Sequence, residues 1–138
     1  MKGSALNILL VEDDELDVMN VRRAFEKNHI TNPLYVAANG LEALDMLRNG
    51  TLPVERRLVL LDLNMPRMNG IEFLREVRAD PALRKLVVVV LTTSNNDRDR
   101  IDAYDLNVAG YLVKPVTFAD FSDLMVTLDK YWTIVQMP

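Results

Sequence analysis

Several side chains that could do chemistry stand directly after short apolar segments of this sequence. In chain order they are Glu12, Asp13, Asp14, Asp62, Thr92, Thr93 and Lys114. If they meet, their carboxylates repel one another, by about 4 kcal/mol for two charges 4 Å apart at the effective dielectric of a protein surface. Such a group requires a counter-charge. Oxygen ligands without histidine or cysteine indicate Mg²⁺, which binds through one or two carboxylates and keeps exchangeable waters.

The same residues could hold a phosphoryl group. A carboxylate can attack phosphorus, as in enzymes that form an aspartyl phosphate, while a metal ion and an ammonium group stabilise the charge on the equatorial oxygens. Asp62 is the best candidate for the nucleophile because it stands centrally, after the third apolar segment. Lys114 would supply one positive charge, and the Thr92 hydroxyl one hydrogen-bond donor.

These side chains meet only if the apolar segments are parallel strands of one sheet. The expected strands span residues 6–11, 34–38, 58–61, 87–91 and 109–113. Amphipathic helical patterns follow them, beginning near Leu16, Leu41, Ile71, Asp97 and Thr117. Right-handed crossovers between such elements give an α/β fold, a doubly wound parallel sheet with helices on both faces. Five strands favour the flavodoxin-like order 2-1-3-4-5, in which the first and third strands are neighbours.

Length and composition limit what the chain can be. With 138 residues, positions 1–138 are expected to form a single domain without an effector domain. The net charge of −4 argues against nucleic-acid binding, which usually needs a concentrated basic face, so protein partners are expected. The absence of cysteine excludes disulfides and thiolate chemistry. The longest apolar run, Leu86–Leu91, is too short to span a membrane, which favours a cytoplasmic location.

Five motifs occur in an order and at a spacing typical of one family. They are Val11-Glu12-Asp13, Leu61 to Pro66, Met68 with Gly70, Leu91-Thr92-Thr93, and Tyr111 to Pro115. Thirty positions separate Asp62 from Thr92, and twenty-two separate Thr92 from Lys114. Over about residues 6 to 130 the chain closely resembles the receiver domains of response regulators in two-component systems. The resemblance implies a signalling domain that is phosphorylated by a histidine kinase, not an enzyme.

The resemblance also implies roles for single residues. Asp62 would be phosphorylated, and Asp13 and Asp62, with the backbone carbonyl of Asn64, would bind Mg²⁺. Glu12 would act on the metal through a bound water. Thr93 stands where such domains often have alanine or glycine, which could slow transfer from small phosphodonors.

Other residues would respond to the phosphoryl group. Lys114 would pair with it, positioned by a cis peptide before Pro115, a bond at which the cis form costs little. Thr92 would swing toward a phosphoryl oxygen, and Tyr111 would follow it inward. This movement would carry the signal to the surface formed by the fourth helix, the fifth strand and the fifth helix.

A narrower resemblance concerns the input and the assembly. Residues 92–95, residues 104–108 and the Tyr131-Trp132 ending look like single-domain regulators of phytochrome-type, light-sensing histidine kinases. The kinase could then be a bacteriophytochrome. Such regulators are often homodimers through the last strand and helix, and the apolar C-terminal tail is compatible with that. A histidine phosphotransfer protein is a second possible partner.

Taken singly, these residues have ordinary explanations: acids cap helices, lysines are solvated and strand-end threonines bond to the backbone. Their joint position at strand ends favours the site. Three alternatives stay open. A Mg²⁺-dependent phosphohydrolase with an aspartyl nucleophile would need an acid where Asn64 stands. A nucleotide or flavin binder would need a loop of free amides, not an acidic one, after the first strand. A receiver-like interaction module could keep the pocket without ever being phosphorylated.

Overall fold

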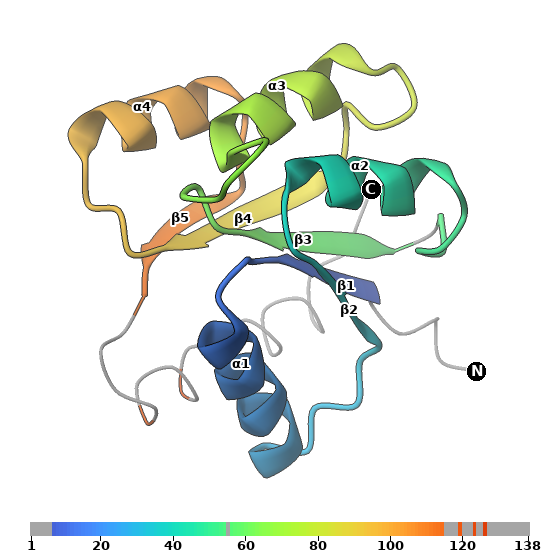
Figure 1. The fold of residues 1–138 in the computed structure, drawn as a ribbon, viewed down its shortest axis with the longest axis vertical. Helices are drawn as coiled ribbons and strands as arrows, with labels where there is room; N and C mark the ends of the chain where they lie inside the picture. The colour runs from blue at the N-terminus through green and yellow to red at the C-terminus, as the bar shows by residue number, and fades with distance from the viewer. Residues whose placement is uncertain (1–6, 55, 115–118, 120–122, 124–125, 127–138) are drawn as a thin grey trace.

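In a computed structural model the chain forms a five-stranded parallel sheet with helices on both faces (Figure 1). The structure describes residues 7–54 and 56–114, and residues 119, 123 and 126 singly. The strands are β1 (Asn7–Val11), β2 (Leu34–Ala37), β3 (Arg57–Leu61), β4 (Val87–Thr92) and β5 (Gly110–Val113). Their order, β2-β1-β3-β4-β5, confirms the predicted flavodoxin-like arrangement.

Four helices follow the strands in the described part of the chain. They are α1 (Glu15–Lys27), α2 (Gly40–Arg48), α3 (Gly70–Ala79) and α4 (Asp97–Asp105). Each begins at an Asp or Asn whose side chain accepts a hydrogen bond from a backbone amide of the first turn. These caps are Asp14, Asn39, Asn69 and Asn96. The fifth helix, predicted from Thr117, lies outside the described residues.

The strands alternate their side chains between two separate cores. Leu9, Val11 and Val59 face the side on which Figure 1 shows α2, α3 and α4, and there they pack with Phe73 and other residues of α3. Ile8, Leu10, Leu58 and Leu60 face α1, where they pack with Val21, Ala24 and Phe25. Full burial of each such large side chain stabilises the fold by about 1.5–3 kcal/mol. The sheet therefore is fixed from both faces.

Burial differs among the strands and helices. The outer strands β2 and β5 are only half-buried, because each has a neighbouring strand on one side alone. In α4, the apolar residues Ile101 and Tyr104 are 57% and 50% exposed, and Ala103 is the one buried residue of the helix. The small side chain of Ala103 brings α4 close to its neighbours and leaves the larger apolar residues on the surface.

The register of the strands sets which residues meet at the carboxyl edge of the sheet. Val11 of β1 aligns with Leu61 of β3, and the Asp62 amide donates to the Val11 carbonyl at 3.0 Å. Thr92 of β4 aligns with Val113 of β5, and the Lys114 amide donates to the Thr92 carbonyl at 2.8 Å. The functional candidates therefore leave the sheet side by side. None of the described helices has the length and apolar character that crossing a membrane requires.

Candidate functional site

Three carboxylates meet at the carboxyl edge of β1 and β3. Oxygen atoms of Glu12, Asp13 and Asp62 all lie within 4.8 Å of one another. Glu12 and Asp62 are buried and Asp13 is exposed, so the group opens to solvent on one side. The structure thus brings together three of the four acids expected to meet, whereas the fourth, Asp14, is exposed and caps α1.

Asp62 is held by its neighbours on both oxygens. Oδ1 accepts hydrogen bonds from the buried Thr92 hydroxyl at 2.8 Å and from the Asn64 amide at 3.2 Å. Oδ2 lies 3.7 Å from Lys114 Nζ. The Asn64 side chain is exposed, while its backbone lies beside Asp62. The carboxylate is therefore fixed in orientation, in contact with a hydroxyl group and close to a cation.

Gly70 allows the loop after Asp62 to fold back closely on itself. A Cβ atom at this position would lie 2.7 Å from the Asp62 carbonyl oxygen and 2.7 Å from Leu63 Cα, both backbone atoms. The Gly70 amide donates to the Leu63 carbonyl at 3.1 Å. Only glycine fits this approach, which explains the glycine of the third sequence motif.

Lys114 is the buried cation of the site. Its side chain is 6% exposed, and its Nζ pairs with Glu12 Oε1 and, at 2.6 Å, with Asp17 Oδ2. Asp17 is not among the site residues predicted from the sequence. Its signal was present: Asp17, Val21 and Ala24 recur at helical spacing on the face of α1 that packs on the sheet, and an acid on such a face requires a partner.

Burial and charge shift the pKa values of the two central groups. Burial raises the pKa of Glu12 to about 7; the Asp62 charge adds to this, and the hydrogen bond from Lys114 works against it. Burial works to lower the pKa of Lys114, but hydrogen bonds to Asp17 and Glu12 outweigh it, so the pKa is raised. Lys114 therefore stays charged, while Glu12 gains a proton more readily than an ordinary carboxyl group.

The donor set fits a hard divalent cation. Glu12, Asp17 and Asp62 lie around the Lys114 ammonium, and Asp13 lies beside Glu12 and Asp62. With four carboxylates and one ammonium, this group is strongly negative when all are ionised. Clustered carboxylate oxygens are what Mg²⁺ and Mn²⁺ prefer. Glu12 already pairs with Lys114 through Oε1 and with the Asp14 amide through Oε2, so it is less available as a direct ligand than Asp13 or Asp62. The role of Glu12 through a bound water stays a prediction.

Tyr111 and the residues after Thr92 form a second hydrogen-bonded group beside the site. The Tyr111 hydroxyl donates to the Ser94 carbonyl at 3.0 Å, and the Ser94 hydroxyl donates to Asp99 of α4 at 2.7 Å. The Arg100 guanidinium lies 5.5 Å from the centre of the Tyr111 ring. The loop after β4 is thus tied both to β5 and to α4. The predicted cis peptide at Pro115 lies outside the described residues.

Comparison with known proteins identifies the family. The model of the response regulator receiver domain matches residues 8–126. The chain belongs to the response regulator receiver domain family. Receiver domains are signalling modules of two-component systems that work with histidine kinases, and they bind Mg²⁺ or Mn²⁺ at an acidic pocket such as the one described above.

Individual relatives resemble this receiver domain over nearly its whole length. The probable methanogenesis regulatory protein FilR2 of Methanothrix harundinacea is 40% identical over 130 residues, covering 91% of this chain and 82% of FilR2. Response regulator Rcp1 of Synechocystis sp. is 36% identical over 131 residues, covering 91% of this chain and 87% of Rcp1.

Solved structures agree with the fold. The phosphorylated cyanobacterial phytochrome response regulator RcpA gives a TM-score of 0.87 at 32% identity, covering 98% of this chain and 99% of RcpA. The Mn²⁺-bound form of Rcp1 gives a TM-score of 0.83 at 36% identity, covering 96% of this chain and 99% of Rcp1.

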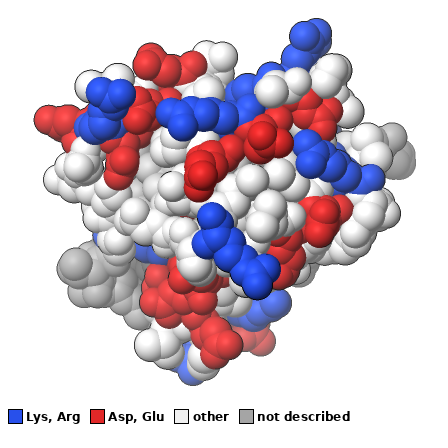
Figure 2. Space-filling model, turned by 45° about the horizontal axis from the view of Figure 1, so that its top comes forward, with Lys and Arg blue, Asp and Glu red and all other residues white. Residues whose placement is uncertain are grey.

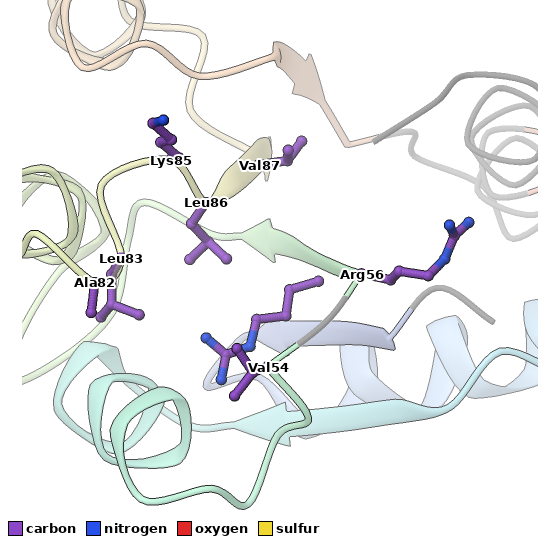
Figure 3. A pocket seen from close by; sticks show the side chains of 8 residues that line it. Val54, Arg56, Ala82, Leu83, Lys85, Leu86 and Val87 are labelled. Carbon is purple, nitrogen blue, oxygen red and sulfur yellow. The ribbon is translucent and has the colours of Figure 1, made fainter. Parts of the chain in front are cut away.

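A separate cavity of about 190 Å³ lies at the amino edge of the sheet, far from the acidic group (Figure 3). It is lined by Val54, Arg56 and Arg57, and by residues that lead into β4, namely Ala82, Leu83, Lys85, Leu86 and Val87. In Figure 3 the Arg56 side chain points away from Ala82 and Leu83. None of the predicted site residues lines it, so this cavity plays no part in the chemistry of the receiver domain's acidic site.

The charged side chains on one face of the receiver domain are mixed in sign. Figure 2 shows Lys and Arg side chains interspersed with Asp and Glu side chains over the described part of this face. Neighbouring charges of opposite sign screen one another, and at physiological ionic strength their field fades within about 8 Å. On the described part of this face, therefore, the opposite charges largely offset one another at a distance.

Proposed function

We propose that this receiver domain is a phosphoacceptor response regulator, in which Asp62 takes a phosphoryl group from a histidine kinase in the presence of Mg²⁺. The observation that supports this most is the setting of Asp62. Its carboxylate is buried, bonded to the Thr92 hydroxyl at 2.8 Å, 3.7 Å from the Lys114 ammonium, and grouped with two further carboxylates. A nucleophile, a charge-stabilising cation and a metal-binding group therefore lie at one point.

In the proposed reaction an Asp62 oxygen attacks the phosphorus of a phosphohistidine. A new O–P bond forms, the P–N bond breaks, and the imidazole keeps the electron pair and then takes a proton. Lys114 stabilises negative charge on the equatorial oxygens, and the Thr92 hydroxyl offers a further hydrogen bond. Asp13, Asp62 and the Asn64 backbone carbonyl would hold Mg²⁺, with Glu12 acting through water. When bound, Mg²⁺ neutralises charge on the phosphoryl group and the carboxylates.

We infer that the signal leaves through α4 and β5. When Thr92 turns to a phosphoryl oxygen, it gives up its bond to Asp62 and makes room for Tyr111. The exposed apolar residues Ile101, Tyr104 and Val113 lie on these elements and offer a surface that such a shift would reshape. The phosphoryl group need only bond differently to two existing states, not create a new fold.

We propose further that the kinase is of the phytochrome type and that light is the input. The phytochrome response regulator RcpA supports this through its similarity in sequence and fold. A homodimer through α4, β5 and the C-terminal tail, and onward transfer to a histidine phosphotransfer protein, also remain proposals. So does the extent of the domain, residues 1–138, for which the match over residues 8–126 is the support.

The alternative functions predict different reactions. In a phosphohydrolase an acid two residues after the nucleophile would protonate the leaving group, and the exposed Asn64 amide cannot do so. Rapid multiple turnover of phosphomonoesters with Mg²⁺ would favour that reading. An interaction module that is never phosphorylated would accept no label from any kinase.

Phosphotransfer from a radiolabelled histidine kinase tests the proposed function. The parent chain should become labelled, and Asp62→Asn should lose the label completely while keeping its circular dichroism spectrum. Asp45→Asn is a matched control, because Asp45 is an exposed acid of α2 that lies outside the carboxylate group. Labelling of Asp62→Asn at the parent level would contradict the assignment of Asp62.

A further inference from the structure

Asp17 and Asp62 face the same ammonium group at unequal distances. Lys114 Nζ lies 2.6 Å from Asp17 Oδ2 but 3.7 Å from Asp62 Oδ2. The first distance is that of a charge-assisted hydrogen bond, whereas the second is too long for a hydrogen bond. Lys114 is therefore bonded directly to Asp17 and not to Asp62, the proposed phosphoacceptor.

The bond to Asp17 is well placed to persist. The Lys114 side chain is 6% exposed and that of Asp17 27%, so water screens the pair only partly. Asp17 lies in the first turn of α1, and the helix is fixed to the sheet by Val21, Ala24 and Phe25. The Asp17 carboxylate therefore approaches Lys114 from a rigid element.

A phosphoryl group on Asp62 would compete with Asp17 for Lys114. The ammonium has three N–H donors, of which Glu12 and Asp17 already take two. A phosphoryl group on Asp62 carries roughly two negative charges, which attract the same ammonium. One N–H donor is left for a phosphoryl oxygen, but Asp17 at 2.6 Å and a phosphoryl group on Asp62 would attract the same Nζ toward different points.

We propose that Asp17 is a positioning residue that holds Lys114 back in the unphosphorylated protein and thereby opposes phosphorylation. This inference rests on the proposed function of Asp62. Two effects act in the same direction: the bond to Asp17 holds Nζ 3.7 Å from the Asp62 carboxylate, and the negative charge of Asp17 repels the phosphoryl group. Removing the charge of Asp17 therefore favours the phosphorylated state.

Binding of beryllofluoride, a stable mimic of the phosphoryl group, measures this effect at equilibrium. Isothermal titration at saturating Mg²⁺ should show that Asp17→Asn binds beryllofluoride about fivefold more tightly than the parent chain, a change typical of a partly exposed ion pair. Glu15→Gln is the matched control. It removes one negative charge from the same exposed first turn of α1, and it should change the affinity less than twofold.

The outcomes separate the two proposals. If neither the parent chain nor any variant binds beryllofluoride, the proposed function is wrong, and the role of Asp17 is overturned with it. If all bind with equal affinity, the proposed function stands and the role of Asp17 alone is overturned. A lower melting temperature of Asp17→Asn with unchanged affinity would also overturn it, because Asp17 would then serve only to stabilise α1. Damage to the fold cannot imitate the expected result, since it would not tighten binding.

Discussion

At the amino edge of the sheet two partly buried guanidinium groups donate to backbone carbonyls, whereas at the carboxyl edge one buried ammonium faces carboxylates. Arg57 donates to the carbonyls of Leu47, Leu52 and Pro53. Arg78 donates to those of Arg84, Leu86, Leu106 and Asn107. Lys114 instead pairs with Glu12 and Asp17 and lies near Asp62.

The pKa values follow this difference. Burial lowers the pKa of Arg57 and Arg78, because neutral carbonyls satisfy their donors without supplying a negative charge. The pKa of Lys114 is raised despite its burial, because carboxylates surround it. At the amino edge the polar groups are matched within the protein and serve stability. At the carboxyl edge negative charge is left over, which the proposed Mg²⁺ would balance.

The largest effect on stability is expected at the amino edge. Arg78→Met keeps much of the apolar stem but removes the donors to four carbonyls, which link α3 to the segments that precede β4 and β5. The free energy of unfolding should fall by about 3 kcal/mol, as measured by urea denaturation. Phosphotransfer to the folded fraction should be unchanged. A loss below about 0.5 kcal/mol would mean that water replaces these hydrogen bonds. It would contradict the statement that the polar groups at the amino edge serve stability.

At the carboxyl edge, stability should depend on metal. Mg²⁺ at ten times its dissociation constant should raise the free energy of unfolding by about 1.4 kcal/mol, because it binds only the folded state. Asp13→Ala should remove this gain, whereas Glu15→Gln, at an exposed acid outside the carboxylate group, should keep it. Thermal unfolding with and without Mg²⁺ measures both. An equal gain in Asp13→Ala would show that the ion acts elsewhere.

The smallest effect is expected in how the stabilisation by Mg²⁺ changes with pH. Since the pKa of Glu12 is raised to about 7 in the folded protein, this group contributes stability that is complete below its ordinary pKa of 4.5 and is lost as pH rises through about 7. Mg²⁺ favours the ionised form. Its apparent affinity should therefore fall by up to about tenfold from pH 8 to pH 6. In Glu12→Gln the apparent affinity for Mg²⁺ should vary less over this range. An equal variation would show that a group other than Glu12 takes up the proton.

Much of the fold was predictable from the sequence, since it depends on local patterns. Apolar segments such as Val87–Leu91 could only be buried strands, and Asn69 and Asn96 mark helix starts by their capping chemistry. The convergence of Glu12 and Asp62 was also predictable, because parallel strands place their carboxyl ends at one edge.

The rest depends on side-chain reach and packing, which sequence patterns do not fix. Asp17 is separated from Lys114 by most of the chain, and their ion pair depends on how α1 packs on the sheet. The exposure of Ile101 and Tyr104 likewise follows from the close packing of Ala103, since helical spacing alone does not reveal which apolar residues face the core.

We propose that a metal ion offsets the repulsion among the crowded carboxylates and that Asp62 then receives the phosphoryl group. A crystal structure with Mg²⁺ and beryllofluoride tests it most directly. We expect beryllofluoride bonded to Asp62, a metal ion bound by Asp13 and Asp62, and Lys114 Nζ within hydrogen-bond distance of a fluorine atom. An unmodified Asp62 with Lys114 directed into solvent would contradict it.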